Sequence, residues 1–530
     1  MPPVREKSGA AAVRRKIMIN IVQQCTKDTV VYFYQEACAG LEKLPASVRR
    51  MFAGEYLQTA WMADVINATD SADVRVATDA TDAMNVTGAI NATDSADPTG
   101  ATDMDNRLAL LVGTGKPGRE YLHLKELGAK AAKECKSKKI YDFSINIENI
   151  INEHGLQAVR HIAEGIILGV YTQRQFKETE KEEISVELYG IPGDMLEEAQ
   201  ALLEETVILT EGVCFARDMV NLPGNRLRPA DFAAAVLDFV KDTGIQAELL
   251  DEAALKEKGM HALLGVGESS AYPPCLLVLR YQGDPNSTHV TGLVGKGVTC
   301  DTGGYCLKPS GSMLGIKGDM AGGAAVCGAL YALAKNHVRA NAVAVVPMCE
   351  NRISSGSLLP GDVIGSYAGK TIEIANTDAE GRLILADAVS YAVREENATE
   401  ILDIATLTGA VVSMLGFTVG GAICDEDGLY ERFYKAYACS GERYWRLPFY
   451  EEHEKMIESK IADIRNLSSK GCGTITAGLF IRAFAEGRPW LHLDIAGTAW
   501  VDEPAFEFQT AGATGAGVTS IYQLCRGENM

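Results

Sequence analysis

The chain lacks the features that mark several large classes of protein. No stretch of its 530 residues holds eighteen consecutive apolar side chains, so we expect no membrane span, and no signal-peptide core follows the start. The thirteen cysteines show no paired spacing, and their odd number favours a reducing compartment over a disulfide framework. A formal net charge of −20 argues against nucleic-acid binding through a general field, which leaves only a local basic patch open. We therefore expect a cytoplasmic protein.

Histidine is scarce, with eight residues scattered along the chain. No His-Glu-X-X-His sequence occurs, and its absence excludes the helical zinc site of that type. We therefore expect each histidine to be structural. His492, which lies in the apolar run 490–495, is expected to pack within a strand.

The N-terminus is basic, with positive side chains at Arg5, Lys7, Arg14, Arg15 and Lys16. A solvated basic tail is the simpler interpretation, and an organelle-targeting peptide is the alternative.

Residues 64–106 stand apart in composition. The octapeptide 66–73 recurs unchanged at 90–97, and the segment holds nine aspartates against one basic residue, Arg75. With few large apolar side chains, this insert cannot offset its ordering entropy by burial. We expect it to be a low-complexity, disordered Ala/Thr/Asp repeat. The alternative, an Asp-rich calcium-binding repeat, would need regularly placed glycines.

The remaining sequence has the order of an α/β protein. A chain with 47% hydrophobic residues can bury two cores, since one core rarely exceeds ~250–300 residues. Apolar runs at 108–112 and 140–145 alternate with helical patterns at 122–135 and 150–171. Residues 195–219 have the pattern of one long helix. Strand-like runs and helices continue beyond it, which predicts a mixed sheet flanked by helices.

The octapeptide 376–383, Asn-Thr-Asp-Ala-Glu-Gly-Arg-Leu, is the most informative stretch. Asp378 and Glu380 are hard oxygen ligands whose spacing lets both face one cation, while Arg382 can hold an anion nearby. Such a pair of acids alone is weak support for a metal site. A second polar set lies upstream in glycine-rich segments, and it comprises Lys296, Asp301, Lys308 and Asp319.

The charges of these residues predict that the site binds cations. The four carboxylates, gathered together, would repel one another and could not all ionise unaided. Two divalent cations would balance them, activate a shared water and polarise a peptide carbonyl. A lone lysine or aspartate is usually a surface charge, but this joint pattern favours a two-metal hydrolase. The carboxylates are Asp301, Asp319, Asp378 and Glu380.

At these residues the sequence resembles the leucyl aminopeptidase family (M17-type) of two-metal exopeptidases, from about Ala216 to the C-terminus. Further matches lie at 216–221, 348–351, 360–363, 405–409 and 494–497, with a weaker one at 163–169. The resemblance implies a smaller N-terminal α/β domain over 1–193. In this family the long helix joins it to a larger C-terminal α/β catalytic domain, here 194–530, with a mixed central sheet.

The resemblance also implies a role for each ligand. Asp301 and Glu380 would bridge two metals, Lys296 and Asp319 would bind the tighter metal, and Asp378 would bind the exchangeable one. Lys296 must then bind as a neutral amine, because the metal displaces its proton. The cofactors implied are Zn²⁺ and/or Mn²⁺, with Co²⁺ or Mg²⁺ as alternatives at the exchangeable site.

Two further residues would act on the substrate or the water. Lys308 would stay charged and stabilise the developing oxyanion. Arg382 would hold a bicarbonate ion that serves as general base toward the bridging water, so no side chain is needed as base.

Matching to the family also suggests a pocket for the first substrate side chain. Ala499 is smaller than the methionine common at that place in relatives, which should leave room for Leu, Met or Phe. The pocket positions are Ile316, Thr406, Leu407, Gly409, Ala496 and Ala499.

The sequence therefore predicts an aminopeptidase that removes apolar residues from peptides with a free N-terminus, and the family resemblance implies a homohexamer. One alternative is a dipeptidase specialised for Cys-Gly-type substrates. Another is a moonlighting DNA-binding or chaperone-like role, which the acidic chain and the filled catalytic positions disfavour. Cys300 and Cys306 flank the site; we expect small buried side chains there, with oxidation sensing as the alternative.

Overall fold

The computed structural model describes residues 17–35, 55, 57–65, 76–77, 106–115, 121–173, 176, 183–468 and 470–527. The expectation for the basic residues 5–16 lies outside these ranges. The chain forms two compact units. The N-terminal unit contains Ala11–Val207 and Phe506–Gln509, and the C-terminal unit contains Ile208–Ala505 and Thr510–Met530. Among the described residues, no helix is long and apolar enough to cross a bilayer.

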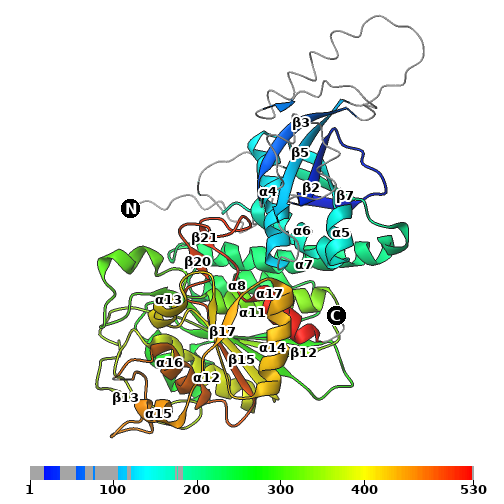
Figure 1. Ribbon diagram of the computed structural model, residues 1–530. Coiled ribbons are helices and arrows are strands. Elements are labelled where there is room, and N and C mark those ends of the chain that lie inside the picture. Colours follow the sequence, from blue (N-terminus) through cyan, green and yellow to red (C-terminus); the bar gives the residue numbers. More distant parts are fainter. Residues whose placement is uncertain are drawn as a thin grey trace, which may run out of the picture. The chain divides into compact units, whose positions relative to one another are not determined.

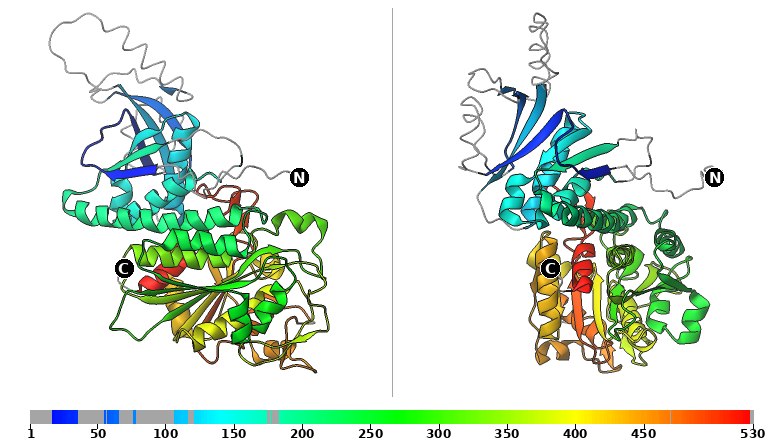
Figure 2. Two further views of the ribbon diagram at one scale, coloured as in Figure 1. Left: turned by 180° about the vertical axis from the view of Figure 1, so that it is seen from behind. Right: turned by 90° about the vertical axis from the view of Figure 1, so that its right-hand side faces the viewer.

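The long helix expected at 195–219 is present as α7 (Leu196–Asn221) (Figure 2). The two units divide inside it, between Val207 and Ile208. The domain boundary expected between residues 193 and 194 stands just before this helix and remains a prediction.

The N-terminal unit is built on one mixed sheet (Figure 1). Its buried strand residues, with those of the helices α4 (Tyr121–Ser137), α5 (Glu148–His154) and α6 (Gln157–Gly169), form a separate hydrophobic core. In order across the sheet the strands are β1 (Ile17–Ile21), β7 (Ile184–Tyr189), β6 (Asp142–Asn146), β2 (Thr29–Gln35), β5 (Asn106–Gly115), β3 (Thr59–Val65) and β4 (Val76–Ala77).

One helix expected in this unit is divided. The pattern at 150–171 predicts a single helix, but the structure has α5 and α6 with a break at Gly155. Gly155 has φ +65°, a left-handed conformation that ends α5, and its N–H bonds to the Ile151 carbonyl. The apolar periodicity continues through the break, which is why the pattern alone hid it.

Most of the insert at 64–106 lies outside the described residues. Its ends are described, since β3 and β5 pair antiparallel through Asp64 with Arg107 and Val65 with Asn106. Within the insert, the two residues of β4 pair with β3. The insert therefore leaves the sheet at the tip of the β3–β5 pair.

The C-terminal unit contains a nine-stranded mixed sheet, and together with the N-terminal unit it confirms the expected α/β class. Its central strands are parallel, whereas β8, β9 and β16 run antiparallel to their neighbours, apart from the short parallel pair of β16 with β17. In order the strands are β17 (Tyr444–Arg446), β16 (Gly420–Cys424), β19 (Trp490–Asp494), β15 (Glu400–Ala405), β10 (Thr291–Gly295), β12 (Asn341–Asn351), β9 (Cys275–Gln282) and β8 (Gln246–Leu250), with β11 (Gly297–Asp301) pairing with β12.

Helices cover both faces of this sheet (Figure 1). Val294 of β10 packs with buried residues of α12 (Glu380–Arg394), while the next residue, Gly295, lies against the Gly322 backbone of α11 (Ala321–Lys335). Because neighbouring strand residues point to opposite faces, α11 and α12 lie on opposite sides of the sheet. Strands buried on both faces explain the nearly continuous apolar runs.

The carboxyl ends of the parallel strands β10, β11, β12, β15 and β19 meet at one edge of this sheet. Open α/β sheets place their binding sites at this edge, because loops from several strands converge there.

Candidate metal centre and active site

The predicted polar residues converge at the carboxyl edge of the C-terminal sheet. Lys296 lies between β10 and β11, and Asp301 is the last residue of β11. Asp319 stands two residues before the start of α11. Glu380 begins α12, and Asp378 stands two residues before it. Segments far apart in the sequence thus supply one cluster.

Two lysines tie the four carboxylates together. The Lys296 Nζ lies 2.7 Å from Asp319 Oδ2 and 2.8 Å from Glu380 Oε1. The Lys308 Nζ lies 2.7 Å from Asp301 Oδ2 and also pairs with Asp378. The two ion-paired sets meet where carboxylate oxygens of Asp301, Asp378 and Glu380 approach one another, so the six charges form one network with twice as many carboxylates as ammonium groups.

The arrangement fits a metal centre. One carboxylate oxygen from each of Asp301, Asp378 and Glu380 lies within 4.8 Å of the other two. Glu380 is almost fully buried, and its Oε2 has no hydrogen-bond partner within the described part of the chain. A buried, unsatisfied carboxylate oxygen is costly unless a cation or donor fills the place in front of it. Hard oxygen donors of this kind suit divalent cations.

Burial and mutual repulsion alter the protonation of the acids. Burial, reinforced by the charge of Asp301, raises the pKa of Glu380 to about 8. Burial raises the pKa of Asp319 to about 6, and the same two causes raise the pKa of Asp378. Without added cations the site therefore keeps part of its acid protonated, as expected for an excess of negative charge.

The lysines respond in the opposite sense. Burial by itself would lower the pKa of Lys296, but Asp319, Glu380 and Asp301 hold it well above its ordinary value. The pKa of Lys308 is raised in the same way, chiefly by Asp301 and Glu380. Both ammonium groups are thus charged at neutral pH, and a metal could bind Lys296 only by displacing its proton.

Arg382 lies in the first turn of α12 and is buried. Its Nη1 donates to the Asn466 carbonyl at 2.8 Å, whereas its Nε has no partner among the residues described. Burial lowers the pKa of Arg382 to about 10, so the group is still a cation at neutral pH. A buried guanidinium with an open N–H is suited to holding a small anion.

The structure links two of the six expected pocket residues to this network and two more to Asp494. Thr406 donates from Oγ1 to Asp319 at 2.8 Å, and its carbonyl accepts from the Lys296 Nζ. The Ile316 carbonyl accepts from the Asp301 N–H. The N–H groups of Leu407 and Ala496 both donate to Asp494.

The other two expected pocket residues have no such link. Gly409 begins α13 (Gly409–Leu415), and Ala499 is buried beyond the end of β19. The assignment of all six residues to a substrate pocket remains a prediction.

Three polar residues that sequence reasoning left without a role hold the network or the loops that carry the expected pocket residues. Asn351 donates to Asp301, Thr377 joins the two acid-bearing segments, and Asp494 holds the loops after β15 and β19. Asn351 and Asp494 lie in segments that match the family, and Thr377 lies within the octapeptide, but their contacts connect residues 50 or more positions apart. No local pattern reveals such pairs.

His492 is a buried residue of β19, as expected. Its Nδ1 lies 2.5 Å from Asp403 Oδ1, and Asp403 also accepts from the indole N–H of Trp490. Of the two cysteines, Cys300 is buried, as expected, whereas Cys306 is only partly buried.

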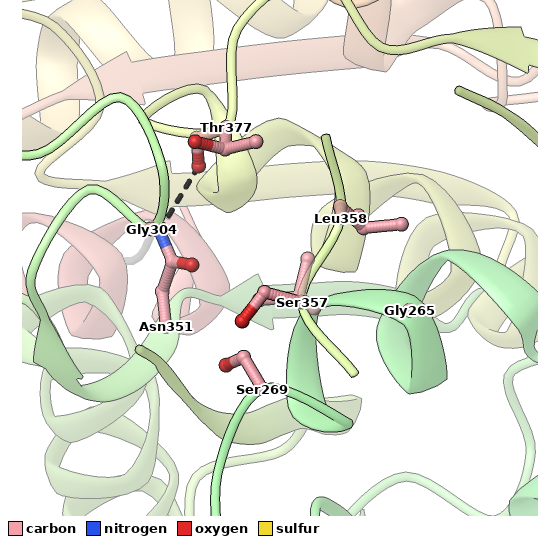
Figure 3. Close-up of a pocket in the computed structure, with 8 residues that line it drawn as sticks. Gly265, Ser269, Gly304, Asn351, Ser357, Leu358 and Thr377 are labelled. Carbon is pink, nitrogen blue, oxygen red and sulfur yellow. Dashed lines mark hydrogen bonds between the residues drawn. The ribbon is translucent and has the colours of Figure 1, made fainter. Parts of the chain in front are cut away.

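A small pocket lies beside Asn351 and Thr377 (Figure 3). Its volume of about 10 Å³ accommodates about one water molecule, so it is no substrate site. It is lined by Gly265, Val266, Ser269, Gly304, Asn351, Ser357, Leu358 and Thr377.

Comparison with known families gives matches to both parts of the chain. Residues 214–522 match the catalytic domain of the cytosol aminopeptidase family, and residues 87–180 match its N-terminal domain. A probable cytosol aminopeptidase of Clostridium perfringens is 43% identical over 397 residues, covering 74% of this chain and 80% of that protein. One from Treponema denticola is 40% identical over 426 residues, covering 80% and 89%.

A comparison with solved structures also finds similar chains. The bottromycin maturation enzyme BotP superposes with a TM-score of 0.79 at 29% identity, covering 94% of this chain and 99% of that one. The same enzyme has also been solved in complex with Mn.

Proposed function

The chain belongs to the cytosol aminopeptidase family and is a metal-dependent aminopeptidase, and from this premise we propose that it prefers peptides with an apolar first residue. The observation that carries the metal-dependent reaction is the convergence of Asp301, Asp378 and Glu380 beside two lysines, with the buried Arg382 near Glu380. Two divalent cations, when bound, supply Lewis acidity toward the water and the scissile carbonyl.

Each ligand has a proposed place. Lys296 and Asp319 would hold the tighter metal, Asp378 would hold the exchangeable one, and Asp301 and Glu380 would contribute to both. Mn²⁺ and Zn²⁺ are the proposed metals, with Co²⁺ or Mg²⁺ as alternatives at the exchangeable position. Support comes from the Lys296 and Lys308 contacts, which already place an ammonium cation against each carboxylate.

The catalytic groups follow from charge. Lys308 carries its positive charge between Asp301 and Asp378, where it can stabilise an oxyanion that forms at the substrate carbonyl. Arg382 would hold bicarbonate through its open Nε, and the bound anion would supply a general base toward the attacking water. This division leaves Lys308 to act on the carbonyl and Arg382 to position the base.

The substrate proposal rests on the six positions around Ile316 and Ala499. An apolar pocket selects Leu, Met and Phe by burial, at ~0.8 kcal/mol per methylene removed from water. The enzyme is further proposed to act in the cytoplasm as a homohexamer.

One experiment tests the core of this proposal. Metal content and rates on amides of Leu, Met, Phe and Ala, with Cys-Gly alongside, are measured with and without added bicarbonate. We expect the amides of Leu, Met and Phe to be hydrolysed faster than the amide of Ala and faster than Cys-Gly. A faster rate on Cys-Gly would favour the dipeptidase alternative.

The bicarbonate role has a matched control on the same helix. Arg382→Ala should abolish the stimulation by bicarbonate, whereas Arg394→Ala, at the last turn of α12, should keep it. Equal stimulation of both variants would refute the role of Arg382.

A further inference from the structure

Two segments that carry proposed metal ligands lie unusually close together. One is the loop 301–308 after β11, and the other is the turn 376–380 before α12. A Cβ added to Gly303, which has φ +87°, would stand 2.8 Å from Asp378 Oδ1. A Cβ added to Gly304 would stand 2.9 Å from Asn351 Oδ1. The approach therefore depends on glycine at both places.

Asn351 lies between these segments and contacts both. It is the last residue of β12, and the pairing of β11 with β12 places it beside Asp301. Its side-chain Nδ2 donates to Asp301 Oδ1 at 2.9 Å and to the Thr377 carbonyl at 3.0 Å. Figure 3 shows Asn351 and Thr377 facing each other across this bond. A single amide group thus uses one N–H for each ligand-bearing segment.

The contact with Asp301 determines which oxygen is left for a cation. Oδ1 of Asp301 accepts from Asn351 and from the Gly303 N–H at 2.9 Å. Oδ2 faces the Lys308 ammonium at 2.7 Å. The carboxylate is therefore held with one oxygen saturated by neutral donors and the other turned to the positive side of the site. A neutral donor is suited to this task, because a second cation there would compete with a metal for the same charge.

The position of Asn351 is itself fixed from behind. Its carbonyl accepts from both the N–H and the hydroxyl of Thr302, each at 2.9 Å. The buried Ser269 hydroxyl donates to the Glu350 carbonyl at 3.0 Å and accepts from the Arg352 N–H at 2.8 Å. These two bonds lie on either side of Asn351 and restrain its backbone. The side chain can then hold a charged partner without moving toward it.

We infer that Asn351 is a positioning residue that fixes the Asp301 carboxylate for metal binding and locks the two ligand-bearing segments at their working separation. The inference rests on the proposed two-metal function of this site. Asn351 does not touch the substrate or the water; it acts through Asp301 and Thr377.

The test is metal affinity, measured on the full-length protein after metal removal by a chelator. Mn²⁺ is titrated in, and free Mn²⁺ is followed by electron paramagnetic resonance. Asn351→Leu keeps the branching of the side chain but removes both donated hydrogen bonds, so the Kd for Mn²⁺ should rise by about 10–100-fold. Asn351→Ala leaves room for a water that can donate in place of the amide, and it should weaken binding less.

The opposite end of the same strand offers a matched control. Asn341, the first residue of β12, is also buried, and its Nδ2 donates to the carbonyls of Asp284, Ser287 and His289. Asn341→Leu removes a comparable set of bonds far from the acids in the fold. It should lower the melting temperature and leave the Kd for Mn²⁺ within about twofold of the unmodified protein.

The outcomes separate the inference from the proposed function. If the unmodified protein fails to bind Mn²⁺, the proposed function fails. If the unmodified protein binds Mn²⁺ and both Asn351→Ala and Asn351→Leu bind it with the same Kd as the unmodified protein, only the positioning role is overturned. Kinetics give a second readout. The Mn²⁺ concentration for half-maximal activity should rise in both Asn351 variants, while the KM for leucine amide at saturating Mn²⁺ stays near that of the unmodified protein.

Discussion

Among the described residues, the N-terminal unit pairs the buried Lys125 and Arg160 with one carboxylate each, whereas the C-terminal unit gathers four carboxylates, two of them buried, around two lysines. Lys125 of α4 lies 2.6 Å from Glu164 of α6, and both side chains are almost fully buried. Arg160 pairs with Glu205 at 2.7 Å. The Lys125–Glu164 pair joins α4 to α6. These two helices pack closely, since a Cβ added to Gly165 would stand 2.0 Å from the Lys125 carbonyl.

The two clusters differ in how much charge is left without an opposite charge beside it. His161, beside Lys125 and Arg160, has a pKa well below its usual value because it is buried and faces those cations. In the N-terminal cluster of Lys125, Arg160, His161, Glu164 and Glu205, each cation is therefore balanced by one carboxylate, and His161 stays neutral. The C-terminal cluster raises the pKa of Glu380 to about 8 and holds an excess of acid. An unbalanced buried cluster is destabilising by itself, and it becomes favourable when cations bind.

The largest expected effect is loss of a carboxylate from the unbalanced cluster. Asp378→Ala or Glu380→Ala should abolish turnover, because nothing nearby can replace the missing ligand. Folding should survive, since each change removes part of an excess of negative charge. Activity assays, metal analysis and circular dichroism measure this. Near-native activity in either variant with both metals bound would show that the site is assigned wrongly.

The balanced cluster should respond in the opposite way. Lys125→Met leaves Glu164 buried without its lysine, which should cost about 3–5 kcal/mol of unfolding free energy. The specific activity of the folded protein should be unchanged. Urea unfolding measures the loss. The double variant Lys125→Met with Glu164→Leu should recover much of it, and a double variant as unstable as the single one would contradict the pairing argument.

The third prediction concerns pH. The proposed metal binding requires a neutral Lys296 amine and ionised carboxylates, while without metal the pKa of Asp319 is about 6 and that of Glu380 about 8. Because these acid pKa values are raised, the metal-free protein loses stability as pH rises toward about 8, and bound metal restores it. The increase in melting temperature caused by Mn²⁺ should therefore grow from about pH 6 to about pH 8.

Activity should follow the same trend and favour neutral to alkaline conditions. A rate profile that peaks near pH ~5 at saturating metal would refute this expectation, because ligand protonation should by then have released the metal.

A smaller effect is expected in the proposed pocket. Ala499→Met should shift preference from Phe toward smaller residues by ~1–3 kcal/mol, since methylene-sized changes in apolar pockets have this value. Ala499 is buried, so a melting curve must first show that the variant folds. The ratio of kcat/KM for Phe and Ala amides is the measurement, and an unchanged ratio would place Ala499 outside the pocket.

The smallest effect should come from the insert in the N-terminal unit. Joining Ala63 to Arg107 should keep metal content, oligomeric state and turnover, because closing long loops costs only ~0.6 kcal/mol per doubling of length. The structure suggests a gentler deletion that keeps Val65 and Asn106, since these two residues still pair in the β3–β5 ladder. An Asn-Gly turn between them would suit an antiparallel pair.

Loss of the oligomer or of activity in both deletions would show that the insert is an ordered interface element. Limited proteolysis is an independent check, because early cuts in the intact protein are expected between residues 64 and 106.

The sequence by itself determined the class of fold, the long helix α7 and the set of acids and lysines at the site. These features are carried by local patterns: apolar periodicity, and the spacing of Asp378, Glu380 and Arg382 within one octapeptide. Periodicity failed at Gly155, where a left-handed residue divides α5 from α6 without interrupting the apolar pattern.

Only the tertiary structure decided how those residues are held. The amide of Asn351 reaches Asp301 across 50 positions, and Asp494 accepts from the Leu407 N–H across 87. Such contacts exist because parallel strands bring their carboxyl ends together, and strand order is set by packing of the whole sheet. The same packing decides which charges come together. Lys125 and Glu164 are as buried as Lys296 and Glu380, so the excess of carboxylates over ammonium groups, not burial alone, separates the balanced pair from the acid-rich cluster.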